Sequence, residues 1–226
     1  GDDCSASALS ASGAQKSLRS PGHYRYAQDN PTEPTAAMLF GSACHEGVLE
    51  PTTFAERVAC APAVDKRTKD GKAEWADFKY LNDGKIMLAP DDFERAQNCI
   101  NAVLAHPAAS ALLDGALREV SIFWDCERWG IRRKARWDAW KNGVLIDLKT
   151  CADASPSGFA RDAAKFLYHV QAAQYVEAHR VRRGMEPEDW LFIAVESEPP
   201  HAVAVYSLPW PAIEAGAALL DVACER

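Results

Sequence analysis

The stretch KARWDAWKNGVLIDLKT, residues 134–150, decides the fold because it joins two strand-like segments through a hairpin turn. Asn-Gly is a strong signal for a two-residue hairpin loop, since both central positions of a type I′ turn have positive φ. β-Branched and aromatic residues on either side predict strands over 131–141 and 144–150. With Asn142 and Gly143 as the turn, Lys141 pairs with Val144.

Continuing that pairing along both strands places Asp138 opposite Asp147 and Arg136 opposite Lys149. Side chains alternate between the two faces of a strand, so these four residues are expected to share one face. The opposite face is expected to carry the apolar residues Ala135, Trp137, Ala139, Val144, Ile146 and Leu148. The hairpin thus has one core face and one charged face.

Two carboxylates facing each other across a strand pair repel unless something compensates their charge. A hard divalent cation such as Mg²⁺ or Mn²⁺ takes oxygen ligands, so Asp138 and Asp147 are candidate metal ligands. The carbonyl of Leu148 could add a third oxygen. A bound metal lowers the pKa of its water, and Lys149 could position that water or stabilise the phosphorane. These are the parts that phosphodiester hydrolysis requires.

An Asp-x-Lys pattern alone is most simply a surface alternation, with Asp138 facing solvent. The apolar run before Asp147, the Asn-Gly register and the opposed Asp138 together favour the metal site.

The composition predicts one domain: 226 residues with 48% hydrophobic content can bury a sizeable core. No apolar run is long enough for a membrane span, and no signal-peptide pattern begins the chain, so we expect a cytoplasmic protein. The seven cysteines form no CxxC pair, which argues against zinc, iron–sulfur and disulfide frameworks.

A formal charge of −7 does not by itself indicate a nucleic-acid-binding protein, but the basic residues are clustered. One such cluster is a solvated face by default. Three clusters, two of them flanking the candidate site, favour a groove for a polyanion. The expected DNA-binding residues are Arg136, Arg161, Lys165, Lys66, Arg67 and Lys69.

The order of elements predicts an α+β domain with a mixed central β-sheet flanked by helices. We expect a mainly helical N-terminal part over 1–115 and a core of sheet and helices over 116–226, both within a single domain. Expected helices are 5–20, 36–49 capped by Thr35, 52–59, 73–82, 91–104 capped by Asp91, 107–114, 156–166, 169–183 and 211–226. Expected strands are 119–125, 131–141, 144–150, 190–195 and 202–207.

Several segments together resemble the PD-(D/E)xK nucleases, and within them the RecE-type exonucleases (exodeoxyribonuclease VIII). They are KARWD at 134–138, IDLKT at 146–150, YHVQAAQY at 168–175, SPGHY at 20–24, LFGSACHEGVLEP at 39–51 and RTKDGK at 67–72. The resemblance covers residues 20 to about 176. It implies a restriction-endonuclease-like core with an N-terminal helical region.

By this resemblance, Asp138 and Asp147 would bind the metal, Lys149 would be catalytic, and His45 would be a further ligand. The family usually has Glu where this chain has Asp147. From sequence alone, His45 among small residues is more often a core histidine. Further site-lining residues would be Glu119, acting through water, and the helix pair Gln171 and Tyr175, which could equally be a polar rim. Arg136 could bind phosphate or form an ion pair with Asp147. Trp75, near the basic cluster at 66–72, is the best candidate among the tryptophans for base stacking.

The resemblance further implies a Mg²⁺-dependent exonuclease that degrades one strand of linear double-stranded DNA, 5′ to 3′, and leaves single-stranded DNA for recombination. It implies a homo-oligomeric ring, tetrameric or alternatively trimeric, acting with a single-strand annealing recombinase in phage-type recombination. The alternatives are an endonuclease of the same fold and an inactive DNA-binding module.

Overall fold

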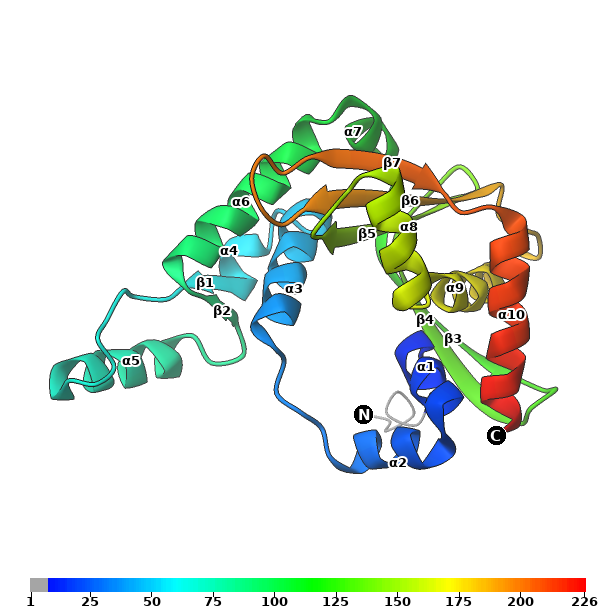
Figure 1. The fold of residues 1–226 in the computed structure, drawn as a ribbon, viewed down its shortest axis with the longest axis horizontal. Helices are drawn as coiled ribbons and strands as arrows, with labels where there is room; N and C mark the ends of the chain where they lie inside the picture. Colours follow the sequence, from blue (N-terminus) through cyan, green and yellow to red (C-terminus); the bar gives the residue numbers. More distant parts are fainter. Residues whose placement is uncertain (1–7) are drawn as a thin grey trace.

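The centre of the fold is a five-stranded mixed sheet, seen edge-on in Figure 1. The computed structural model describes residues 8–226. The strands, in spatial order, are β3 (Leu117–Cys126), β4 (Ile131–Lys141), β5 (Val144–Cys151), β6 (Asp189–Glu196) and β7 (Val203–Ser207). β5 and β6 pair in parallel, while the other neighbours in this sheet pair antiparallel. The expected α+β fold with a mixed sheet is confirmed.

Helices cover both faces of this sheet. The helices of the described chain, of which not all touch the sheet, are α1 (Ala11–Arg19), α2 (Pro21–Asp29), α3 (Ala36–Leu49), α4 (Phe54–Arg57), α5 (Lys69–Leu81), α6 (Pro90–Ala105), α7 (Pro107–Leu113), α8 (Pro156–Lys165), α9 (Tyr168–Arg183) and α10 (Trp210–Glu225). No helix within residues 8–226 has the length and apolar content to cross a membrane.

Most of the expected elements form, but some expectations for the N-terminal part were wrong. The helix expected over 5–20 is α1, with residues 5–7 outside the described part, and α2 was not expected. Ser20 starts α2 because its Oγ accepts a hydrogen bond from the backbone N–H of His23 (3.2 Å), and Pro21 suits the first helical position.

The expected helix over 52–59 is helical only as α4 and then continues as the strand β1 (Val58–Cys60), which pairs in parallel with β2 (Ile86–Leu88). Asp91 does not cap α6, because that helix begins one residue earlier, after Ala89. By contrast, Thr35 caps α3 as expected, accepting from the N–H of Met38 (3.3 Å).

The hairpin between β4 and β5 has the expected turn, and the residue pairs next to the turn have the expected register. Asn142 and Gly143 have φ of 48° and 86°, and Lys141, Trp140 and Ala139 pair with Val144, Leu145 and Ile146. The pairing ends there, one position before Asp138 and Asp147 would meet. The two strands therefore separate where the candidate site begins.

Two hydrophobic cores lie on opposite faces of the sheet. On one face, here called the α9 face, the sheet packs against α1, α8, α9 and α10. The largest fully buried side chains of this core are Trp137, Trp190 and Phe192. On the other face, here called the α3 face, the sheet packs against α3, α6 and α7. This core includes Ala139, Ile146, Leu148 and Ile193.

Along β3 and β4, side chains alternate between the two faces of the sheet, and on both strands this alternation reverses at neighbouring positions. Trp137 belongs to the α9 face but Ala139 to the α3 face, so the expectation that they share a face was wrong. On β3, Val120 packs on the α9 face, whereas Arg118 donates to carbonyls of Leu49 and Leu113 beside the other core. Between these residues lie Glu119 and Asp138, where the β3–β4 register has a gap. Glu119 has φ of 54°, a left-handed conformation that is uncommon for a non-glycine residue.

An arm made of α5 and its flanking loops projects away from the sheet (Figure 1). Within α5 Gly71 is the buried residue, while Tyr80 and Leu81 are largely exposed. Asp65 approaches the Cα of Gly71 so closely that a Cβ there would lie 2.1 Å from its carbonyl oxygen.

Candidate active site

The candidate site lies in a cavity of about 900 Å³ beside the point where β4 and β5 separate. Its wall is formed by α3, by Gln15 of α1 and by the connection between α8 and α9. Charged and polar side chains from the gap in β3 and β4 reach into it. The separation of the strands leaves backbone groups of β5 without ladder partners from β4, so side chains can bind them.

Asp138 occupies the gap between the separated strands. Its Oδ2 accepts a hydrogen bond from the backbone N–H of Leu148 (2.8 Å), and the residue is 9% exposed. Burial, followed by the nearby Asp147 carboxylate, raises the pKa of Asp138 from an ordinary 3.8 to about 7. A carboxylate in this position is poorly stabilised unless a positive charge joins it.

Asp147 is completely buried and is held from two sides. Lys149 Nζ lies 2.6 Å from Asp147 Oδ2, and Gln171 Nε2 donates to Oδ1 (2.7 Å). Oδ2 thus meets the lysine ammonium in a close, hydrogen-bonded ion pair. A buried carboxylate is costly unless it is paired and hydrogen-bonded, so Asp147 depends on these two partners.

Lys149 is positioned by three contacts. Besides Asp147, its Nζ donates to Gln171 Oε1 (3.2 Å) and lies 4.9 Å from the centre of the Tyr168 ring. Burial opposes the charge on Lys149, but the carboxylates of Asp147 and Asp138 outweigh it and raise the pKa of the amine. The side chain is therefore a cation fixed beside the carboxylates.

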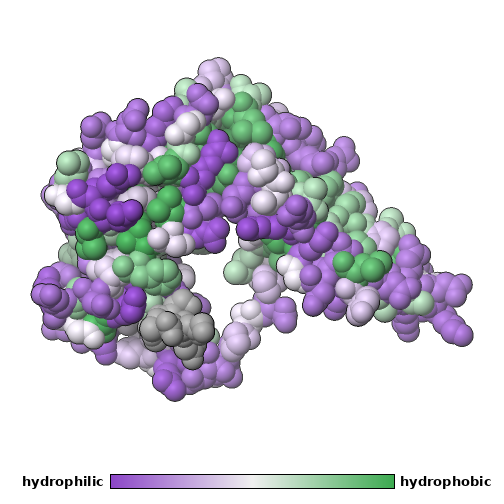
Figure 2. All heavy atoms as spheres, turned by 180° about the vertical axis from the view of Figure 1, so that it is seen from behind, coloured by the Kyte–Doolittle hydropathy of each residue, from purple (hydrophilic) through white to green (hydrophobic). Residues whose placement is uncertain are grey.

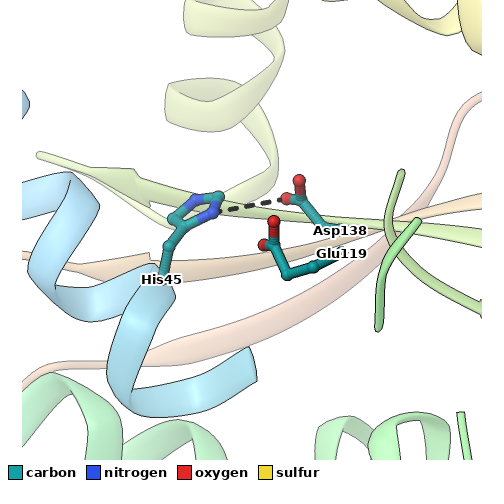
Figure 3. A group of neighbouring side chains, drawn as sticks. All are labelled: His45, Glu119 and Asp138. Carbon is teal, nitrogen blue, oxygen red and sulfur yellow. Dashed lines mark ion pairs between the residues drawn. The ribbon is translucent and has the colours of Figure 1, made fainter. Parts of the chain in front are cut away.

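His45 reaches the site from α3 and faces Asp138 (Figure 3). Its Nε2 lies 2.8 Å from the Leu148 carbonyl oxygen, and its Nδ1 lies 3.6 Å from Asp138 Oδ2. A carbonyl can only accept, so Nε2 carries the proton and Nδ1 presents its lone pair to the carboxylates. Burial, then Lys149, lowers the pKa of His45 and keeps the imidazole neutral.

Glu119 completes this group of possible ligands. One ligand atom each from His45, Glu119 and Asp138 lies within 4.8 Å of the others. Burial raises the pKa of Glu119, opposed by Arg136, which forms an ion pair with it. Glu119 has a positive φ at the position where the side-chain alternation of β3 reverses, and this conformation turns its side chain toward Asp138.

The donor set fits a hard divalent cation. Carboxylate oxygens, a neutral imidazole nitrogen and the Leu148 carbonyl oxygen meet in one partly buried place, where the carboxyl pKa values of Asp138 and Glu119 are raised. The carboxylate of Asp147 faces Lys149 and Gln171 and lies outside the three-residue group.

Gln171 and Tyr175 lie one helical turn apart on α9 and line the cavity. Gln171 bridges Asp147 and Lys149 through its amide, so it does more than form a polar rim. Burial raises the pKa of the Tyr175 hydroxyl, which shares a hydrogen bond with Gln171, and its ring packs edge-on against Trp190.

Arg136 does not lie opposite Lys149, as the extended register had predicted. It pairs with Ser121 across β3, forms an ion pair with Glu119 and approaches Glu50 Oε2 at 3.9 Å. The reason is the end of the β4–β5 pairing at Ala139. Arg136 still lines the cavity.

The other expected DNA-binding residues fall into two places. Lys165 lines the cavity, and Arg161, on the same helix, forms an ion pair with Asp153 (3.4 Å). Lys66, Arg67 and Lys69 belong to the arm. There Lys66 Nζ lies 3.1 Å above the ring of Trp75, which stacks on Phe78, so Trp75 is already occupied.

Sequence reasoning missed three contributors: Glu46, Glu50 and Tyr168. Glu46 and Glu50 line the cavity and both bind Arg57 at 3.0 Å, while Tyr168 lies over Lys149. The first two are four apart on the helix that carries His45, a spacing that places them on one face. This spacing was the feature of the sequence that indicated a shared face for Glu46 and Glu50.

Comparisons with known proteins agree with this geometry. Residues 10–226 match a sequence family described as a PDDEXK-like domain of unknown function (DUF3799). A crystal structure described as a "Putative exonuclease" from Eubacterium rectale has a TM-score of 0.69 at 14% identity, covering 96% of this chain and 78% of that chain. A structure of SSO0001 has a TM-score of 0.34 at 14% identity, covering 93% of this chain and 83% of that chain. No curated protein matches the sequence.

Proposed function

Because the chain belongs to the family of PDDEXK-like domains (DUF3799), we propose that it is a metal-dependent exodeoxyribonuclease. It degrades one strand of linear double-stranded DNA, in the 5′ to 3′ direction, and leaves single-stranded DNA for recombination. Membership of the PD-(D/E)xK superfamily, expected from the sequence, is confirmed by the family match, and the likeness to the Eubacterium rectale structure confirms the fold. One observation carries the proposal: Asp138, Asp147 and Lys149 meet beside His45 where β4 and β5 separate.

The residues divide the chemistry between them. Asp138, Glu119 and His45, with the Leu148 carbonyl and Asp147, would hold Mg²⁺ or Mn²⁺. The cation supplies an acidified water and neutralises charge on the scissile phosphate. Lys149 is a fixed cation that orients a water molecule by hydrogen bonding and stabilises the extra negative charge of the transition state. Gln171 holds Asp147 and Lys149 in place.

Lys165 and Arg136 line the cavity, where they would bind phosphates of the DNA strand on either side of the cleaved bond. The carboxylates themselves repel a polyanion, so DNA binding in the cavity should require the cation. This dependence explains how a chain with a net charge of −7 can act on DNA.

The test is digestion of linear duplex DNA with 5′-phosphorylated ends beside a closed circular duplex, with Mg²⁺, with Mn²⁺ and with EDTA. We expect loss of the linear DNA alone, only with a cation. Lys149→Ala should be inactive, and Lys141→Ala, at the turn end of the same hairpin, should retain activity. Linearised circles would indicate an endonuclease, and an intact linear substrate with folded protein would indicate a DNA-binding module without activity.

We also propose that copies of the chain assemble into a ring, tetrameric or alternatively trimeric, and work in the cytoplasm with a single-strand annealing recombinase. A ring would combine an acidic outer surface with a channel that presents the basic residues to DNA. Light scattering coupled to size-exclusion chromatography measures the assembly, and a monomer at micromolar concentration would contradict it.

A further inference from the structure

The molecule encloses an opening that passes through it beside the candidate site. Figure 1 shows the chain running from α2 across open space to α3, and Figure 2 shows the opening in the space-filling view. The crossing segment is residues 30–35, here called the strap. The strap is exposed throughout, as are the adjoining residues 28–29 and 36–38.

The strap begins from a firmly attached support. On α1, Ser17 Oγ donates to the Ala223 carbonyl (3.0 Å), and Arg226 donates to the Leu18 carbonyl (2.7 Å). Gln15 Nε2 donates to the carbonyls of Phe166 and Leu167, both at 3.2 Å, so α1 is fixed to the cavity wall. A short bridge between Leu9 and Arg133 ties the start of this segment to the sheet.

The strap ends on an equally firm support. The buried side chains of Phe40, Ala43 and Cys44 pack α3 into the core of the α3 face, and His45 reaches Leu148 from the same helix. Between the supports, Pro31 and Pro34 fix two of the six φ angles and stiffen the strap. Six extended residues span roughly 20 Å, enough to cross over a polymer strand.

The cavity opens into this enclosed space. Gln15, on one side of the opening, and Met38, at the start of α3 on the other, both line the cavity that contains Asp138 and Lys149. At about 900 Å³, the cavity has the size of a small-ligand site, which suits a few nucleotides of a single strand. Because Gln15 and Met38 border both the cavity and the opening, a strand lying in the cavity can continue under the strap.

We propose that a single strand of nucleic acid reaches the site by threading its free end through this opening, so that the strap restricts cleavage to strands with an end. The inference rests on the proposed nuclease function and adds the substrate form: a single-stranded end. Selection by topology differs from recognition of the terminal phosphate, because it depends on the strap being continuous and not on any group at the end.

The test opens the strap without removing it. A recognition sequence for a specific protease is inserted between Thr32 and Glu33, and the same sequence is inserted at Asp83–Gly84, in the turn after α5, as the matched control. After cleavage, the contacts of α1 with Ala223 and Arg226 hold the two pieces together. Digestion of closed circular single-stranded DNA is then compared with that of the linear form, with Mg²⁺.

We expect both uncut insertion variants and the cut control to digest linear DNA and to leave the circle intact. The variant cut in the strap should digest both. Digestion of the circle by the uncut protein at the rate of the linear form would overturn the inference. So would a circle that resists the strap-cut protein while linear DNA is digested, because end recognition would then be responsible.

A binding measurement separates this inference from the nuclease proposal. Lys149→Ala, added to the same insertion variants, should associate with linear single-stranded DNA faster than with the circle by roughly tenfold or more, since the circle cannot thread. Cutting the strap should abolish the difference. If no variant cleaves DNA yet this difference is found, the nuclease proposal fails and threading stands. Equal binding before cutting, as expected if the opening accommodates a protein segment, overturns threading.

Discussion

Replacing Asp138 with Asn should stabilise the metal-free protein while abolishing cleavage. The carboxyl is buried beside Asp147, and its pKa is raised from 3.8 to about 7. A group with a raised pKa in the folded state stabilises fully below its unfolded pKa, and that contribution is lost as pH rises through the folded value. Above pH 7 the ionised Asp138 therefore destabilises the fold, by up to about 4 kcal/mol.

Asn removes this charge and keeps the key contact, since its Oδ1 can accept from the N–H of Leu148 as Asp138 Oδ2 does. Its amide nitrogen then takes the place of the other carboxyl oxygen. Allowing for the burial of that polar amide, we expect a gain of about 2 kcal/mol at pH 8, or roughly 4–8 °C in Tm. The gain should shrink as the pH falls from 7 and approach zero below pH 3.8, where the parent carboxyl is protonated in both states.

The assay is thermal unfolding followed by circular dichroism in EDTA at pH 4.5, 6 and 8. Asp125→Asn serves as the control because it removes a strand carboxylate whose side chain is 78% exposed, and it should change Tm little at any pH. Added Mg²⁺ should stabilise the parent by ligand binding and the Asp138→Asn variant much less. An Asp138→Asn variant that unfolds below the parent at pH 8 in EDTA would refute this account of the site.

Three further substitutions test neighbouring parts of the structure. Lys149→Ala should reduce cleavage by about 10²-fold or more while the protein still folds and binds metal by calorimetry; near-normal turnover would remove the lysine from the mechanism. His45→Ala should weaken metal binding and activity, measured as kcat/KM against Mg²⁺ concentration, and unchanged kinetics would make the histidine a packing residue. Gly216→Ala should lower the free energy of unfolding by about 1–3 kcal/mol or more, because a Cβ there would lie 2.0 Å from the His169 carbonyl oxygen. Gly22→Ala, with its nearest neighbour at 3.6 Å, is the control for denaturant unfolding.

The sequence predicted the hairpin well because its determinants are local. Asn142 and Gly143 specify the turn, and the turn specifies the pairing of the adjacent residues. What it did not predict was the end of that pairing. Glu119 and Asp138 are far apart in sequence, and the shared reversal at their level depends on packing against two different cores. No local pattern marks such a position.

For the site, too, the sequence predicted some features and missed others. The motif residues Asp138, Asp147 and Lys149 come together as expected, although Asp138 and Asp147 are not a cross-strand pair. Arg136 was misplaced because its position was extrapolated from a register that had already ended. Glu119 was expected to line the site, and it lies within the group of possible metal ligands with His45 and Asp138. Its positive φ is the reason, because this conformation turns the side chain toward them.

The attachment of α1 to the far end of the described chain has a consequence for synthesis on the ribosome. Residues 9–18 are made before their partners, which are Arg133, then Phe166 and Leu167, and finally Ala223 and Arg226. Until the last of those residues have been made, the α1 wall of the cavity lacks its contacts with α10. The nascent chain therefore cannot complete this wall of the candidate site until residues 223–226 have left the exit tunnel.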